Sequence, residues 1–139
     1  MANIIPFAFR GELLSGTHNF ANGGNSFKIA LYTSFAAYST SSTNYLTTNE
    51  VSASNTGYAT GGKVLASQAV VSTGAVATVD FADSTLTSAT FTANSAAIYN
   101  DTNADKLCVV LDFGGNKTAT NGTFTISFPN PSTPANAII

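Results

Sequence analysis

Apolar and polar residues alternate along most of this chain, and this period of two limits its fold more than any other feature. Phe27, Ile29 and Leu31 share one face of a predicted strand. The same alternation returns at residues 64–71, 76–81, 86–91, 96–99 and 124–128, and Gly, Ser, Thr, Asn or Asp residues bound each segment. Such segments are typical of short strands joined by turns. The pattern predicts an all-β fold, an antiparallel two-sheet β-sandwich of jelly-roll or immunoglobulin-like type.

Residues 107–113 are predicted to form a central strand that is covered on both faces. The odd-numbered residues of this segment are apolar, and so are Cys108 and Val110 on the opposite face. A strand without a polar face is typical of a sheet interior. Cys108 is the one cysteine, so an intrachain disulfide is excluded, and we interpret it as a small buried hydrophobic residue.

A chain of 139 residues is near the commonest size of one domain. Residues 1–25 are predicted to form an apolar N-terminal arm with one short helix near Glu12 to Ser15, and residues 26–139 the β-sandwich domain. Residues 34–62 do not fit the strand pattern, and a connection this long is usually functional or disordered. Its aromatic residues favour an ordered lobe or contact loop, because disordered segments are poor in them.

The composition argues against several classes of function. Charged residues make up 9% of the chain, with one His and no Trp, whereas acid–base and nucleophilic catalysis use clusters of such groups. We therefore expect no enzyme, no cofactor and no metal. The five basic residues lie far apart, which predicts no nucleic-acid partner. The start lacks a positive region, and the longest strongly apolar run is far too short to span a bilayer, so we expect synthesis in the cytoplasm and no membrane contact.

His18 raises the alternative of a Ser-His-Asp hydrolase, because Ser15 and Ser26 lie near it in the sequence. The chain has no Gly-x-Ser-x-Gly elbow, however, and a triad is defined by its geometry. A His just past a short helix more often caps carbonyl groups or lies exposed. We favour that interpretation.

Asp101, Asn103 and Asp105 have the oxygen spacing of a calcium loop, and Asp112 falls at the twelfth position. Lys106 stands where such loops need Gly, and Asp112 lies in an extended apolar run instead of at the start of a helix. A polar hairpin turn between strands that end at Tyr99 and begin at Lys106 explains the same residues. The turn is favoured, and metal binding stays the alternative.

Apolar side chains outside the strand pattern are candidates for contact with another protein. A Phe-rich arm at a chain terminus is a common way to dock on a neighbouring subunit, and aromatic side chains give contact area at low entropy cost. Ile138 and Ile139, at the other end of the sequence, are apolar side chains that could contact another subunit in the same way. The candidate contact residues are Ile4, Ile5, Phe7 and Phe9 in the arm, and Phe35, Tyr38, Tyr45 and Tyr58 in the loop.

Two segments near the N-terminus resemble the opening of a group of small tailed-bacteriophage virion proteins: residues 9–20, FRGELLSGTHNF, and residues 27–34, FKIALYTS. Later pieces resemble the same group in the same order, and together they cover nearly the whole chain: NEV at 49–51, GY at 57–58, GG at 61–62, DFAD at 80–83, AIYN at 97–100 and VLDFG at 110–114. The group includes capsid decoration or cement proteins, which are β-sandwich modules bound as oligomers to the outside of a capsid.

The resemblance implies a non-enzymatic virion structural protein that binds the capsid lattice from outside and stabilises it. Its partners would be the major capsid protein and its own copies, as a homo-dimer or homo-trimer, on a capsid surface reached from the host cytoplasm. The alternative is a tail or fibre component that binds a host-surface glycan. A cement protein should show two apolar contact surfaces, and an adhesin a concave polar site with stacked aromatic residues.

Overall fold

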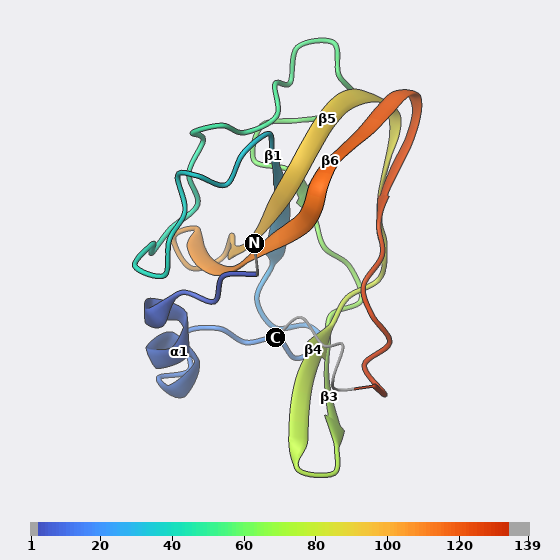
Figure 1. Cartoon of the computed structure of the whole chain (residues 1–139). Helices are drawn as coiled ribbons and strands as arrows, with labels where there is room; N and C mark the ends of the chain where they lie inside the picture. Colours follow the sequence, from blue (N-terminus) through green and yellow to red (C-terminus); the bar gives the residue numbers. More distant parts are fainter. Residues whose placement is uncertain (1–2, 134–139) are drawn as a thin grey trace.

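The structure, a computed structural model, describes residues 3–133, and almost all of its regular structure is β (Figure 1). Strands β2, β1, β5 and β6 form one antiparallel sheet in that order, and β3 pairs with β4 in a second sheet. The elements are α1 (Phe7–Leu14), β1 (Phe27–Tyr32), β2 (Lys63–Val64), β3 (Ala69–Thr73), β4 (Val76–Asp80), β5 (Ser84–Asn100) and β6 (Lys106–Ile126). The predicted all-β class with one short helix and two antiparallel sheets is confirmed.

Strand β1 divides its side chains between two hydrophobic cores. Phe27, Ile29 and Leu31 enter the larger core, while Ala30 and Tyr32 enter a second core on the opposite face of the sheet. The predicted alternation is thus confirmed, and both faces are covered. Segment 34–62 provides part of the second cover, so the prediction of an ordered lobe is also confirmed.

β5 and β6 form one long hairpin, where the sequence pattern suggested separate short strands. Several register shifts interrupt the pairing without ending it. The largest lies where Ala93 pairs with Lys117 and Ser95 pairs with Asp112, which leaves residues 113–116 opposite one residue of β5. Gly114 and Gly115 both have positive φ there, and such bulges bend strands sharply. The hairpin curves over (Figure 1), and side chains from both of its halves enter the larger core.

The predicted central strand is buried as expected but lies at the edge of its sheet. Residues 107–111 are all buried, yet β6 is the last strand in the order β2-β1-β5-β6. Ile4 covers this edge through two backbone hydrogen bonds with Val110, both 2.8 Å long. The N-terminal arm therefore supplies the cover that the apolar pattern predicted from a neighbouring strand.

The helix begins earlier than predicted. α1 starts directly after Pro6, includes Gly11 and ends before Gly16, whose φ of 77° suits a helix stop. The predicted stop is confirmed, and the predicted start near Glu12 is wrong. Phe9 is buried in the larger core, and this packing outweighs the cost of about 1 kcal/mol that an interior glycine imposes on a helix.

The predicted strand at residues 64–71 is divided between the two sheets. β2 ends at Val64 and pairs with β1, while β3 begins at Ala69 and pairs with β4. Ser67 between them has a φ of 55°, a left-handed backbone conformation that interrupts an extended strand. The β3–β4 hairpin extends away from the larger sheet (Figure 1).

Candidate functional site

Helix α1 is held against the larger sheet by an ion pair between residues 94 positions apart. Lys106 Nζ, at the start of β6, donates a 2.8 Å hydrogen bond to Glu12 Oε1, and Glu12 Oε2 lies 2.8 Å from His18 Nε2. Burial alone would raise the pKa of Glu12, but the hydrogen bonds from Lys106 and His18 outweigh it and hold this pKa below its ordinary value. Glu12 is therefore ionised at neutral pH and anchors α1.

His18 lies inside the protein, so the prediction that it caps carbonyl groups or lies exposed is wrong. Its side chain is fully buried. Its Nδ1 is 3.0 Å from Asn100 Nδ2 on β5, and its ring centroid is 5.0 Å from that of Phe9. Glu12, six residues before His18, and Asn100, 82 residues after it, thus satisfy the two ring nitrogens. The sequence near His18 carries no sign of Asn100.

Among the described residues, neither Ser15 nor Ser26 makes a hydrogen bond with His18. Cys108 Sγ is 3.8 Å from His18 Nδ1, but the thiol is buried, and its burial and the charge of Glu12 raise its pKa. Ser15 Oγ bonds instead to the carbonyl oxygen of Glu12. A nucleophile must be accessible and activated, and neither Cys108 nor Ser15 meets both conditions. This cluster is suited to holding α1 in place.

Residues 101–105 form the predicted turn between β5 and β6. Asp101 Oδ1 makes an ion pair with Lys28 Nζ at 2.9 Å, and the side-chain amide of Asn103 donates to the carbonyl oxygen of Thr17. Within residues 3–133, no group of three or more His, Cys, Asp and Glu residues is arranged to hold a metal ion. The polar side chains of this turn fasten it to the protein's own segments.

The predicted contact residues of the arm have different environments. Phe9 is buried in the larger core, Ile5 packs partly buried against that core, and Ile4 packs against the second core. Phe7 is 62% exposed. Three of these four side chains thus contribute to the protein's own fold, and Phe7 is the one that presents a large apolar surface to solvent.

Three of the four predicted contact residues of the loop, Phe35, Tyr38 and Tyr45, pack in or against the second core, and Tyr58 packs in the larger core. Tyr38 and Tyr58 are buried, and Phe35 and Tyr45 are partly buried. Their main role in the structure is therefore to cover the sheet. Ile138 and Ile139 lie outside the described residues.

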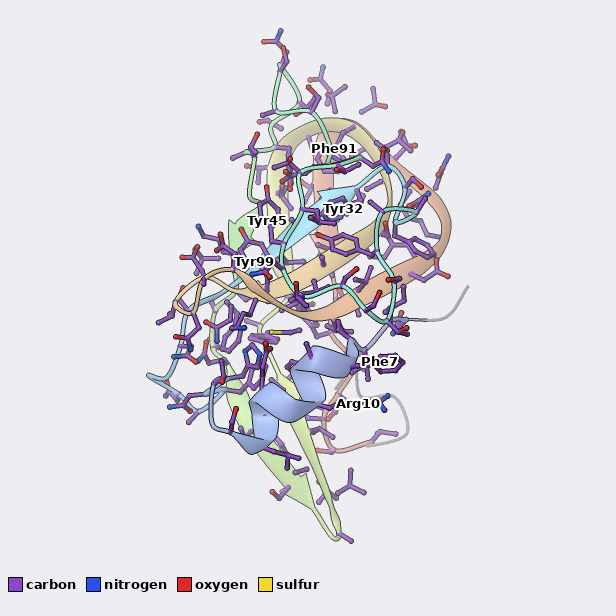
Figure 2. The ribbon with its side chains drawn as sticks, turned by 90° about the vertical axis from the view of Figure 1, so that its left-hand side faces the viewer. Phe7, Arg10, Tyr32, Tyr45, Phe91 and Tyr99 are labelled. Atoms are coloured by element: carbon purple, nitrogen blue, oxygen red, sulfur yellow. The ribbon has the colours of Figure 1, made fainter. Side chains whose placement is uncertain are left out.

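Glu50 organises this lobe, and sequence reasoning did not identify it. Its carboxylate accepts hydrogen bonds from the hydroxyl groups of Tyr45 and Tyr58, both 2.6 Å long, and from the amide of Gly61 at 2.7 Å. Tyr45 stacks on Tyr99 with ring centroids 4.6 Å apart, and Figure 2 shows these two rings side by side. Glu50 is the one charged residue within positions 34–62, which was the available sign of its role.

The two remaining tyrosines extend this network. The Tyr32 hydroxyl donates to the Leu46 carbonyl oxygen at 2.7 Å and lies 2.8 Å from the Tyr38 hydroxyl, which accepts from the Leu46 amide at 2.9 Å. Four of the five tyrosines, Tyr32, Tyr38, Tyr45 and Tyr99, thus lie in or against the second core, and Glu50 links Tyr45 to Tyr58 in the larger core. Burial raises the pKa of all five tyrosines above the ordinary value of 10.0.

The exposed side of α1 combines large apolar side chains with a cation. Phe7, Arg10 and Leu14 have the spacing of one helix face, and Leu14 is 92% exposed. Figure 2 shows Phe7 and Arg10 projecting away from the sheet. Arg10 makes no ion pair within the part of the chain that the structure describes. We call Phe7, Arg10 and Leu14 the α1 stripe.

A second exposed apolar surface lies on the β3–β4 hairpin. Val70 is 53% exposed and Val76 is 46% exposed, and positions 68–79 contain no charged residue. A groove of about 340 Å³ separates this hairpin from α1 and includes Leu13, Phe20 and Val79 in its lining. Large exposed apolar side chains thus concentrate on α1 and on this hairpin.

Comparisons with known proteins return no relative: no family model, curated protein or solved structure matches this chain. No helix among residues 3–133 has the length and apolar character needed to cross a membrane.

Proposed function

We propose that this protein is a non-enzymatic structural protein of a tailed-bacteriophage virion that binds the outside of the capsid lattice and stabilises it. The observation that carries the proposal is the α1 stripe: exposed apolar side chains on a helix that is fixed by the Glu12–Lys106 ion pair. A preorganised apolar surface loses little conformational entropy on binding. The resemblance to cement proteins, described above, points in the same direction.

The contact surface is smaller than the sequence suggested. With Ile4, Ile5 and Phe9 engaged in the protein's own fold, Phe7 and Leu14 remain as the apolar anchors. Their burial at the capsid would contribute about 3–6 kcal/mol before ordering costs, at about 1.5–3 kcal/mol each. Many copies per capsid make such a modest single contact sufficient, because the lattice is stabilised by their sum.

The β3–β4 hairpin, which carries no charged residue from position 69 to position 79, suits contact between copies of this chain, as a homo-dimer or homo-trimer. Uncharged, exposed strand edges otherwise favour uncontrolled association. The bent β5–β6 hairpin, with its core between the two halves, fits the sandwich class to which cement modules belong.

A glycan-binding tail or fibre component is the alternative function. Sugar sites usually present aromatic faces in an open, concave polar site. Here the stacked pair Tyr45 and Tyr99 lies in the lobe, with Tyr99 buried and both hydroxyl groups bonded within the protein. This arrangement favours the capsid proposal.

Co-sedimentation with capsids assembled without this protein tests the proposal. The double variant Phe7→Ser, Leu14→Ser should lose most of the binding, and moderate salt should leave wild-type binding largely intact, because salt screens exposed charges without weakening apolar burial. Val64→Ser is the matched control, since Val64 is also exposed, at 53%, but lies on β2. Wild-type protein that does not sediment with capsids, or that occurs in only a few copies per virion, would contradict the proposal.

A further inference from the structure

Among residues 3–133, other segments cover the outer edge of β6 along its first half, and none pairs with its second half. Backbone hydrogen bonds from Ile4 cover it at Val110, residues 43–45 cover it near Lys106, and Asn3 Oδ1 accepts from the amide of Asp112 at 2.9 Å. Beyond the glycine corner, residues 117–126 pair with β5 and, within the described chain, with no strand on the other side. Unpaired edges of this kind accept extended chain segments.

A groove of about 400 Å³ runs beside this bare edge. Phe113, Phe124 and Ile126 supply its apolar lining, and the rings of Phe113 and Phe124 have centroids 6.3 Å apart. Phe113 lies before the corner and Phe124 after it, so the groove opens between the two halves of the bent strand. Thr123 and Thr125 also line it. A free edge with an adjacent side-chain pocket provides the two requirements for strand addition.

The charge of this surface favours a foreign strand over a second copy of β6. Lys117 is the one charged residue in the groove, and it makes no ion pair with any described residue. Positions 113–127 contain no acidic residue. Two β6 edges paired together would bring two lysines onto one ribbon without a carboxylate to offset them. A segment with its own acidic side chain is the complementary occupant.

We propose that the edge of β6 from Lys117 to Ile126 accepts an extended segment of the capsid subunit as an added strand. An apolar side chain of that segment enters the groove against Phe113 and Phe124, and a carboxylate pairs with Lys117. This inference rests on the proposed function and deepens it by naming a second contact and the chemistry of the segment that fills it.

Hydrogen–deuterium exchange of the full chain, free and bound to capsids, tests the inference. We expect capsid binding to slow amide exchange within residues 117–126. Lys117→Glu should weaken co-sedimentation at low salt by about tenfold, because it places like charges together in the contact. Lys63→Glu makes the same charge change at an exposed site on β2 and should leave capsid binding unchanged. Unchanged melting temperatures would show that both variants are folded.

Other outcomes would overturn the inference in distinguishable ways. If capsids bind without slower exchange in residues 117–126, the proposed function stands and this contact is wrong. If slower exchange appears when the protein alone is concentrated, a second copy fills the edge. If the edge is already protected in the free protein and loses that protection when residues 134–139 are deleted, the chain's own end fills it. If the wild-type protein does not bind capsids, both proposals fail together.

Discussion

Replacement of Glu50 should show how strongly one carboxylate stabilises the lobe of segment 34–62. Glu50→Ala leaves the Tyr58 hydroxyl and the Gly61 amide without their acceptor. Hydrogen bonds to charged groups contribute about 1.5–3 kcal/mol each, so the expected loss in the free energy of unfolding is about 3–6 kcal/mol. Tyr45, which is only partly buried, can bond to water instead and adds little to this loss.

Urea unfolding followed by fluorescence or circular dichroism measures this free energy. Glu50→Gln keeps the side-chain volume and one acceptor oxygen, so we expect an intermediate loss, and this variant preserves the test if Glu50→Ala does not fold. Asp80→Ala is the control, because the Asp80 carboxylate makes no hydrogen bond with the described residues, and it should change stability by less than about 1 kcal/mol. A loss for Glu50→Ala no larger than that for Asp80→Ala would refute the reasoning.

Three further predictions concern pH and backbone geometry. The pKa of Glu12 is lowered in the folded protein, so Glu12 stabilises the fold at pH values above its ordinary pKa of 4.5, and this stabilisation is lost as the pH falls through the lower folded pKa. Glu12→Gln should therefore flatten the acid limb of a plot of unfolding free energy against pH. The five tyrosines have raised pKa values in the folded protein, so the free energy of unfolding should stay constant from neutral pH to pH 10.0 and fall as the pH rises further. Spectrophotometric titration should show that the tyrosines ionise as the protein unfolds. Ionisation near pH 10.0 in the folded protein would contradict this. Gly62→Ala should lower the free energy of unfolding by about 3–5 kcal/mol or prevent folding, because a Cβ there would lie 1.9 Å from the Ile29 carbonyl oxygen. Gly74→Ala is the control, since Gly74 also has positive φ but has open space around it, and it should lower the free energy measured by thermal unfolding by only about 1 kcal/mol.

The strand pattern could be predicted because it depends on local alternation. Burial of every second residue is recorded directly in the sequence, as in β1, and the turn at residues 101–105 is marked by its polar residues. Strand ends and partners were harder to predict. A bulge shifts the alternation within a continuous strand, so the sequence pattern predicts two short strands in each of β5 and β6, whereas the pairing in the structure shows one continuous strand in each.

The candidate site depended on contacts between residues far apart in sequence, and these have no local pattern. An apolar arm has the same sequence pattern whether it packs on a partner or on its own sheet. The sequence therefore could not show that Ile4 and Phe9 pack within the protein while Phe7 is exposed. Likewise, nothing near His18 indicates that Asn100 lies beside it. The position of Glu50 as the one charge among aromatic residues was the exception, because an isolated charge in such a segment requires partners.

The contact between Ile4 and Val110 constrains the order in which the chain can fold during synthesis. The arm leaves the ribosome before its edge partner and before the Lys106 that anchors α1, since both follow about a hundred residues later. β1 likewise waits for β5, since Ile29 pairs with Ile98. The β5–β6 hairpin closes through a local turn and can form without the rest. Apart from the short pairing between β1 and β2, the N-terminal half is therefore expected to remain unpaired until this hairpin emerges and gives it a surface on which to assemble.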